Sequence, residues 1–336
     1  MAAAPQVICL GEALVDRLGP LGGDPATAPP DQDQCDDRLG GAPANVACGL
    51  ARLGTASAFV GRLGLDPIGE AFTHLLRQRG VDLSALQHDP IRPSRIVLVR
   101  RDAGGDRSFG GFAGDRGEGF ADQALDATAL QASLPPLLAT ARWLQVGTIP
   151  LATAASAEAL RLALGLAADA GVPLALDVNW RPTFWTPDAA PDAGPSAQAQ
   201  AAMQPLLEQA ALLKLAAEEA QWLFGSRDPV VIRAGLPQHP AVVVTDGGAQ
   251  LAWCFGSSSG VMPAYTVPAV DSTGAGDAFL AGLLHQLCLH PEQLEGGCTE
   301  ALRFASACGA LVCGGAGAID PQPSQPQVER FLAEHR

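Results

Sequence analysis

Short apolar segments alternate with alanine- and leucine-rich segments along most of this chain, and this alternation limits the folds open to it more than any other feature. The apolar segments have the length of buried strands, and the segments between them have the length and composition of helices. Strand–helix units in series build a parallel sheet with helices on both faces, so we predict an α/β fold. The predicted strands are 7–10, 58–60, 142–146, 174–177, 212–215 and 241–245, and the predicted helices are 44–53, 67–79, 152–170, 218–224, 275–288 and 300–313.

Several segments interrupt this alternation. The glycine- and proline-rich residues 24–30 indicate a loop, and the proline- and alanine-rich residues 187–202 indicate a surface insertion that we expect to be mobile. Alternating residues also predict two hairpins. The hairpin strands are 95–101 with 107–112, and 251–255 with 261–265.

No linker separates two complete cores, so we predict a single domain over residues 1–336. Segments 12–38 and 92–112 are rich in glycine and charge and are expected to form a small β lid inserted in it. A lid of this kind can close over a bound ligand and keep water from the groups beneath it. The edges of two such lids could pair and form a homodimer.

Composition excludes several classes of partner. The formal net charge is −14 and Lys214 is the one lysine, so we expect no basic surface for nucleic acid or an acidic membrane. No apolar run reaches the roughly 18 residues that a membrane span needs. The eight cysteines include no C-x-x-C pair, which predicts buried, reduced thiols. No signal peptide is recognised in residues 1–5, and a cytoplasmic location is expected.

Residues 271–277 (Asp-Ser-Thr-Gly-Ala-Gly-Asp) precede a predicted helix and have the composition of an anion site. The small residues Gly274, Ala275 and Gly276 leave backbone N–H groups at a helix start open to a ligand. Such a site suits a phosphate, above all one that gathers negative charge during transfer. Asp277 follows in the first helical turn, where a carboxylate could accept the proton of an attacking hydroxyl. Simple helix capping is the alternative interpretation, and the complete seven-residue string disfavours it.

This string resembles the C-terminal signature of the PfkB, or ribokinase-like, carbohydrate kinases. Residues 40–47 (Gly-Gly-Ala-Pro-Ala-Asn-Val-Ala), followed by 50–54 and 60–69, resemble the first signature of that family and its continuation. The two signatures stand in the right order and the match spans nearly the whole chain. The resemblance is therefore specific.

Within that family the chain is most similar to fructokinases, through residues 11–16, 40–45 and 177–181 together with Trp185. The resemblance implies a ribokinase-like fold of three layers and an ATP-dependent sugar kinase. Such an enzyme would transfer phosphate from MgATP to a primary hydroxyl, most simply converting fructose to fructose 6-phosphate. Asp277 would be the general base, and the amides of residues 274–276 would form the anion hole. The implied substrate-binding residues are Asp16, Gly40, Gly41, Asn45 and Arg181.

The resemblance also implies a nucleotide site and two ion sites. The residues implied for the nucleotide are Lys214, Thr245, Gly247, Gly274, Gly276 and Ser306. Glu219 would act on Mg²⁺ through water, although Ala216 stands where the family motif has asparagine, and Glu218 could substitute. Asp271 and Thr273 match positions that bind a monovalent cation such as K⁺ in some members of the family.

The motifs of other phosphate- and nucleotide-binding enzymes are missing. Leucines precede Lys214, so it cannot belong to a P-loop, and neither protein-kinase motifs nor a dinucleotide-binding G-x-G-x-x-G is present. Two alternatives stay open. One is a kinase for ribose, 2-keto-3-deoxygluconate or a nucleoside. The other is a catalytically inactive sugar-binding or scaffold protein, which Asp277 opposes and Ala216 favours.

Overall fold

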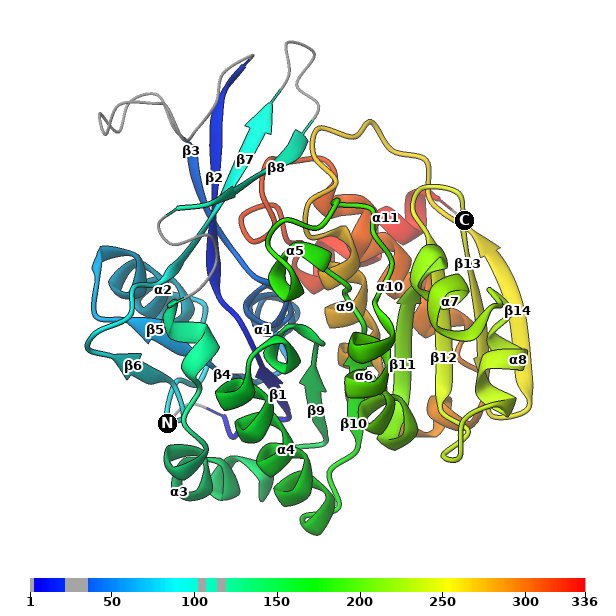
Figure 1. Cartoon of the computed structure of the whole chain (residues 1–336). Helices are drawn as coiled ribbons and strands as arrows, with labels where there is room; N and C mark the ends of the chain where they lie inside the picture. The colour runs from blue at the N-terminus through cyan, green and yellow to red at the C-terminus, as the bar shows by residue number, and fades with distance from the viewer. Residues whose placement is uncertain (1–2, 22–35, 102–106, 114–118, 336) are drawn as a thin grey trace.

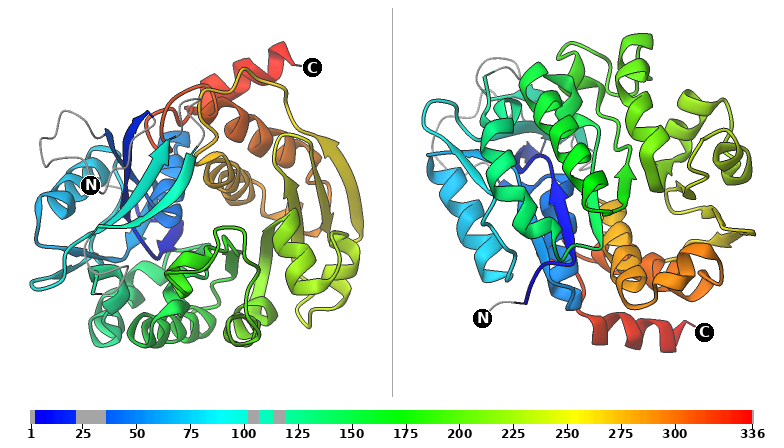
Figure 2. Two further views of the ribbon diagram at one scale, coloured as in Figure 1. Left: turned by 45° about the horizontal axis from the view of Figure 1, so that its top comes forward. Right: turned by 90° about the horizontal axis from the view of Figure 1, so that it is seen from below.

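The computed structural model describes residues 3–21, 36–101, 107–113 and 119–335. Its largest element is an eight-stranded sheet with helices on both faces, in the order β14-β13-β12-β11-β10-β9-β1-β4 (Figures 1 and 2). The strands from β4 to β12 in this order are parallel, and β13 and β14 are antiparallel. The bounds are β1 (Val7–Leu10), β4 (Ser57–Val60), β9 (Trp143–Val146), β10 (Leu174–Asp177), β11 (Ala210–Ala216), β12 (Ala241–Asp246), β13 (Gln250–Phe255) and β14 (Ser258–Pro263).

Each helix layer buries its own core against the sheet. Successive strand residues face opposite sides, so Leu144 and Leu176 join one core whereas Trp143 and Ala175 join the other. Helices α3 (Ala127–Leu138), α4 (Ala154–Asp169) and α6 (Ala197–Gln209) cover the first core, and α1 (Ala42–Leu53), α2 (Pro67–Gln78), α9 (Ala275–Leu289) and α10 (Thr299–Val312) cover the second. The remaining helices are α5 (Pro182–Trp185), α7 (Ala217–Phe224), α8 (Pro229–Ala234) and α11 (Gln325–Glu334).

The predicted α/β fold with a mostly parallel sheet is confirmed. Every predicted strand and helix of the alternating series is present, with ends that agree within two residues. The second predicted hairpin is also present, but its second strand begins at Ser258, three residues earlier than expected. Gly256 turns the chain in the left-handed region, with φ of 55°, and so permits a shorter connection.

The prediction of a mobile surface insertion over 187–202 is wrong for its second half. Helix α6 begins at Ala197, and the Ser196 side chain accepts a hydrogen bond from Ala199 N at 3.2 Å. Ala199 and Met203 are buried in the first core. An alanine-rich segment hides its amphipathic face because alanine is both small and weakly apolar, and composition alone therefore suggested low complexity.

Helices α3, α5, α8 and α11 were not predicted. Helix α3 carries Pro135 and Pro136, which are unusual inside a helix. Its start is marked by Asp126, which accepts hydrogen bonds from Thr128 N and Ala129 N. The start of α11 is marked by the capping pair of Ser324 and Gln327.

A separate four-stranded sheet, here called the small sheet, has the order β3-β2-β7-β8. Its strands are β2 (Leu14–Leu21), β3 (Asp36–Gly40), β7 (Arg95–Arg101) and β8 (Arg107–Phe112). The predicted hairpin is therefore present as β7 and β8, and strand β2 joins it by parallel pairing with β7. The predicted loop 24–30 and the hairpin turn 102–106 lie outside the described residues. A third sheet has two strands, β5 (Arg62–Gly64) and β6 (Gln87–Asp89).

The chain enters and leaves the first two strands of the small sheet through two short crossings. Residues 11–13 lead from β1 to β2, and Gly41 leads from β3 to α1. The crossings are in close contact, because a Cβ atom on Gly41 would lie 2.7 Å from the Glu12 carbonyl oxygen. Gly41 also has φ of 102°, which favours glycine.

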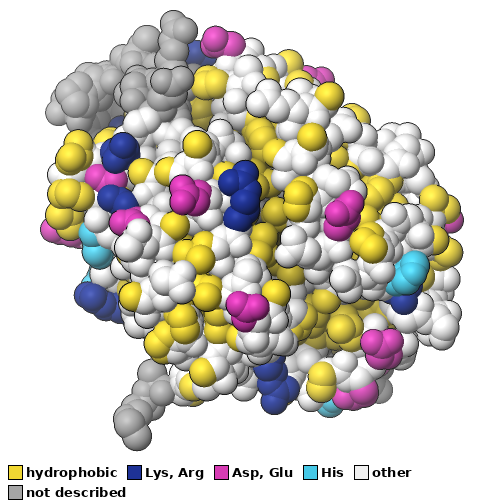
Figure 3. Space-filling view, turned by 60° about the horizontal axis from the view of Figure 1, so that its bottom comes forward, with side chains coloured by type: hydrophobic (Ala, Val, Ile, Leu, Met, Phe, Trp, Pro, Cys, Tyr) yellow, Lys and Arg dark blue, Asp and Glu magenta, His cyan; other side chains and the backbone are white. Residues whose placement is uncertain are grey.

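Two surface properties bear on the predicted partners. On the face shown in Figure 3, lysine and arginine side chains are few and scattered. None of the helices in the ranges that the structure describes is long and apolar enough to cross a membrane.

Candidate active site

Residues from four elements meet where the small sheet joins the large one. Asp16 lies on β2, Gly40 ends β3, Asn45 lies in the first turn of α1, and Asp277 lies in the first turn of α9. The Asn45 Nδ2 group donates a hydrogen bond to Asp277 Oδ2 at 2.7 Å. A Cβ atom on Gly40 would lie 3.5 Å from Asp16 Oδ2 and 3.8 Å from Asn45 Oδ1. The structure thus brings together the predicted sugar residues and the predicted base.

The Asn45 side chain has one hydrogen-bond acceptor that the described residues leave unused. Its side chain is buried, and its Oδ1 atom has no hydrogen-bond partner among the residues that the structure describes. A buried acceptor without a partner costs about 1–3 kcal/mol, which a ligand hydroxyl would recover. The backbone of Asn45 is held by a side chain, because Gln322 Nε2 donates to the Asn45 backbone carbonyl at 2.8 Å. Asn45 is therefore fixed and ready to bind a hydroxyl donor.

The predicted anion site, residues 274–276, lies at the start of α9 and is here called the anion cradle. Gly274 is the N-cap in the left-handed region, with φ of 78°, and a Cβ atom there would lie 2.5 Å from Ala318 Cβ. Only glycine therefore fits at this position. The Ala275 amide donates to the Ser272 carbonyl at 3.2 Å, so an anion would compete with that bond. A helix of 15 residues stands behind the cradle and orients its dipole toward it.

Asp277 has an unusual environment for a carboxylate. Burial raises its pKa to about 6, against the lowering effect of the Asn45 hydrogen bond. Asp177 raises the pKa further, whereas Lys214 and Arg181 lower it. A carboxylate with this pKa is ionised at neutral pH and still basic enough to accept a proton.

Beneath the cradle lies an ion pair that joins two neighbouring strands. Asp177 ends β10 and Lys214 lies opposite it on β11. Lys214 Nζ is 2.9 Å from Asp177 Oδ1 and 2.8 Å from Oδ2, and both side chains are buried. Burial lowers the lysine pKa, but Asp177 outweighs this effect and the net shift is upward. A Cβ atom on Gly276 would lie 3.3 Å from Nζ, so a fixed positive charge supports the cradle from below.

Lys214 was predicted to contact the nucleotide, but in this structure its side chain is not open to a ligand. Its side chain is 8% exposed and bonded to Asp177. Its charge can act on a bound phosphate through the thin layer of Gly276. The importance of Asp177 was not predicted, although a carboxylate that closes an apolar strand is a signal that could have indicated it.

Glu219 is a buried carboxylate held by two backbone amides. Its Oε1 atom accepts from Trp180 N at 2.6 Å, and its Oε2 atom accepts from Ala216 N at 2.7 Å. Burial raises its pKa, and Asp177 adds to this effect. Because Ala216 has no capping side chain, Glu219 provides the polar cap of α7. Glu218, the predicted substitute, is exposed on the same helix.

Two of the remaining predicted nucleotide residues, Thr245 and Gly247, lie at the carboxyl end of β12. Thr245, near the end of β12, donates through Oγ1 to the Leu215 carbonyl at 3.4 Å, and Gly247 follows with φ of 50°. Ser306 lies on α10, and its buried hydroxyl has no partner within the described part of the chain. Arg181 is exposed at the start of α5 and close enough to lower the pKa of Asp277.

Asp271 and Thr273, predicted as monovalent-cation ligands, contact each other. Asp271 Oδ1 accepts from Thr273 N at 3.0 Å and from Thr273 Oγ1 at 2.7 Å. Its Oδ2 atom accepts from Gly317 N at 2.8 Å. Asp271 therefore ties the cradle loop to the loop around Gly317.

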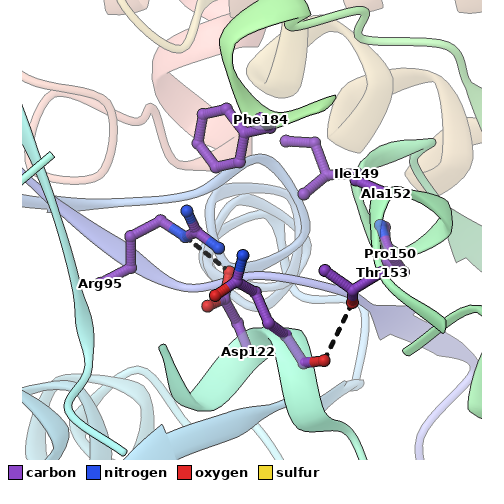
Figure 4. Close-up of a pocket in the computed structure, with 8 residues that line it drawn as sticks. Arg95, Asp122, Ile149, Pro150, Ala152, Thr153 and Phe184 are labelled. Atoms are coloured by element: carbon purple, nitrogen blue, oxygen red, sulfur yellow. Dashed lines mark hydrogen bonds and ion pairs between the residues drawn. The ribbon is translucent and has the colours of Figure 1, made fainter. Parts of the chain in front are cut away.

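An unpredicted buried ion pair ties the small sheet to the rest of the molecule. Arg95 Nε on β7 is 2.8 Å from Asp122 Oδ2, and both side chains are at least 95% buried. The guanidinium carbon lies 4.7–5.0 Å from the ring centres of Phe112, Phe120 and Phe184. Figure 4 shows Arg95 and Phe184 on one side of a small cavity, with Thr153 and Pro150 opposite. Arginine was not expected at a fully buried position, so sequence reasoning missed it.

An anion cradle and a pocket of hydroxyl-binding groups that share one carboxylate define a phosphotransferase that acts on a polyhydroxy compound. Comparison with known proteins agrees with this class. The sequence pattern described as the pfkB family carbohydrate kinase matches residues 4–325, and the chain belongs to this family. The predicted resemblance is thereby confirmed.

Individual relatives cover nearly the whole chain. A fructokinase of Klebsiella pneumoniae is 34% identical over 96% of this chain and 98% of its own length. The structure of a fructokinase from Xylella fastidiosa with bound ATP has a TM-score of 0.81 and 26% identity, and covers 98% of each chain. A Vibrio cholerae fructokinase with fructose, ADP and calcium ion has a TM-score of 0.77 and 28% identity over 98% of this chain and 99% of its own.

Proposed function

We propose that this protein is a fructokinase, which transfers the terminal phosphate of ATP to the 6-hydroxyl of fructose. One observation carries the proposal: Asn45, from the sugar pocket, donates to Asp277, which directly follows the anion cradle. A hydroxyl held by the pocket is therefore beside both a base and a phosphate site. The fructokinase relatives support fructose as the acceptor.

In this mechanism the sugar hydroxyl donates its proton to Asp277 while its oxygen attacks the terminal phosphorus. The bond between that phosphorus and the bridging oxygen breaks, and ADP leaves with the electron pair. The α9 amides and the charge of Lys214 stabilise the negative charge that develops in transfer. Asp16 and Asn45 hold the other hydroxyls, and Gly40 and Gly41 allow the sugar to approach the backbone closely.

The residues at this end of the sheet fit ATP and a magnesium ion. The unpartnered hydroxyl of Ser306 and the open turn at Gly247, where a Cβ atom would meet nothing within 4 Å, support a nucleotide site here. Within the described ranges no cluster of three or more His, Cys, Asp or Glu residues could hold a metal. Mg²⁺ is commonly held by one or two carboxylates, water and substrate phosphates, so Glu219 would suffice as a ligand through water. When bound, Mg²⁺ neutralises phosphate charge.

The small sheet would act as the lid over the sugar. Strand β2 carries Asp16, and the Arg95–Asp122 pair fixes how the sheet is placed against the body of the molecule. Strands β3 and β8 are its edges, and a homodimer through such an edge stays a prediction that light scattering can test. A K⁺ requirement and a cytoplasmic location also stay predictions.

A panel of acceptors tests the proposal. ADP release from MgATP should be measured with fructose, ribose, 2-keto-3-deoxygluconate and a nucleoside, with a sample lacking acceptor as the baseline. We expect fructose to give the highest kcat/KM and fructose 6-phosphate as the product. Turnover of another acceptor without turnover of fructose would reassign the substrate. Sugar binding by calorimetry without any turnover would favour the inactive scaffold.

A further inference from the structure

Glu12 occupies the point where the small sheet joins the large one. It lies in the crossing from β1 to β2, and its side chain reaches the other crossing, because Glu12 Oε1 accepts a hydrogen bond from Ala42 N at 3.1 Å. The side chain is 3% exposed. This contact joins the outgoing and returning connections of the small sheet. The proposed mechanism gives this contact no role.

The second carboxyl oxygen of Glu12 makes no comparable contact among the described residues. Glu12 Oε2 is buried and has no hydrogen-bond partner among the described residues, and within the same residues Glu12 takes part in no ion pair. Two buried cations of the described chain are already paired, Arg95 with Asp122 and Lys214 with Asp177. A buried carboxylate in such a place would be strongly disfavoured, whereas a neutral carboxylic acid is tolerated.

The surrounding charges point the same way. Asp277 at the start of α9 and Asp122 beside β7 both act on Glu12 as like charges, and Asp16 lies on β2, the strand that follows Glu12. Burial is the larger cause, and together these effects raise the pKa of Glu12 to about 8, although its own amide and that of Ala42 lower it. At neutral pH the group is therefore mainly protonated.

The amide that Glu12 binds leads directly into the sugar pocket. Ala42 follows Gly41, and Asn45 N donates to the Gly41 carbonyl at 2.8 Å. A displaced Ala42 amide would therefore move both residues relative to Asp277. The contact between the two crossings therefore bears on the position of Asn45 beside Asp277.

We propose that Glu12 is a positioning residue for the sugar, a neutral carboxylic acid that clamps the two crossings of the small sheet and so fixes Gly41 and Asn45. The proposal rests on the sugar pocket of the proposed function. Ionisation of Glu12 places an unpaired charge between the crossings and loosens the clamp. Fructose binding then weakens, whereas Asp277, which ionises near pH 6, keeps its role as the base.

The kinetic test compares wild type with Glu12→Gln, which is neutral at every pH and keeps an oxygen for Ala42 N. KM for fructose and kcat are measured from pH 6.5 to 9.5 by quenched ADP assays, with KM for ATP as an internal reference. In wild type, KM for fructose should rise as pH passes about 8, by up to about tenfold per pH unit, while kcat stays nearly level. In Glu12→Gln, KM for fructose should stay flat at the value of wild type near neutrality.

Two further variants make the comparison specific. Glu12→Asp keeps the acid but shortens its reach to Ala42 N, so its KM for fructose should be high at all pH values. Glu70→Gln removes an exposed glutamate near the start of α2 and should keep the profile of wild type. The proposal is overturned if the KM of wild type is flat to pH 9.5, or if Glu12→Gln retains the alkaline rise.

A second measurement does not depend on activity. The folded protein holds the Glu12 proton up to about pH 8, whereas the unfolded chain releases it near pH 4.5. The Tm of wild type should therefore fall relative to that of Glu12→Gln as pH rises from 4.5 to 8, and the gap should level off above 8. Parallel Tm curves would overturn a neutral Glu12. Absence of fructose turnover in wild type would refute the proposed function and leave this comparison valid.

Discussion

Lys214 and Asp177 form a buried ion pair whose removal should have a large and separable effect. Lys214→Met leaves the Asp177 carboxylate buried without the ammonium that now lies 2.8–2.9 Å from both its oxygens. Breaking one side of a buried pair costs about 3–5 kcal/mol. The entropy of unfolding is about 2.1 cal/mol/K per residue, or about 0.7 kcal/mol/K for 336 residues. The expected fall in Tm is therefore about 4–7 °C.

Calorimetry and urea denaturation measure this effect in wild type, Lys214→Met, the double variant Lys214→Met with Asp177→Asn, and the control Arg303→Met. The double variant Lys214→Met with Asp177→Asn removes both charges and should regain most of the stability lost in Lys214→Met. Arg303→Met removes an arginine from a loose, part-exposed pair with Glu300 at 3.8 Å and should cost less than about 1 kcal/mol. The reasoning is refuted if Lys214→Met is as stable as Arg303→Met, or if the double variant is no better than Lys214→Met.

Activity should respond differently from stability. Since Nζ lies just beneath Gly276, both Lys214→Met and the double variant should lose kcat by about 10²-fold, the scale for one lost anion-stabilising group. The double variant should thus be stable and slow. Recovery of kcat together with stability would show that Lys214 acts on the fold alone.

Three further predictions concern other parts of the site. Below pH about 6, kcat at saturating fructose should fall about tenfold per pH unit as Asp277 is protonated. Asn45→Ala should move this acidic fall in kcat to higher pH, because it removes a hydrogen-bond donor to the ionised carboxylate. Plots of kcat against pH for both proteins test the two predictions. Gly41→Ala should raise KM for fructose and cost about 1–3 kcal/mol, measured by steady-state kinetics and urea denaturation, because its Cβ atom would lie 2.7 Å from the Glu12 carbonyl. Glu219→Gln turns one of two acceptors toward backbone N–H groups into a donor, so a Mg²⁺ titration should show a higher half-saturating concentration; an unchanged value would contradict the metal role.

The sequence predicted those features that depend on neighbours along the chain. The start of α9, with Gly274 and Asp277, could be located because a glycine cradle and a first-turn carboxylate follow one another directly. The strands of the large sheet could be located because most of their residues are buried on both faces and apolar, as in β1.

Features that depend on contacts between distant segments were missed. Arg95 and Asp122 look like surface charges in sequence, and only the approach of β7 to the segment at 120–124 buries them against aromatic rings. Glu12 looks like a loop residue, and its burial follows from the two crossings lying against each other. The register of β10 against β11 places Asp177 opposite Lys214, and the two strands are far apart along the chain, so their pairing is not visible from neighbours in the sequence.

The most direct test of the account is Asp277→Asn, measured for both kcat and fructose binding. The amide keeps the shape and the contact with Asn45 but cannot accept the proton of the attacking hydroxyl. We predict a fall in kcat of about 10²–10⁴-fold, with the Kd of fructose from calorimetry little changed. Asp169→Asn, an exposed change at the far end of α4, serves as the control and should match wild type. A kcat for Asp277→Asn within about tenfold of wild type would contradict the central claim that Asp277 is the base.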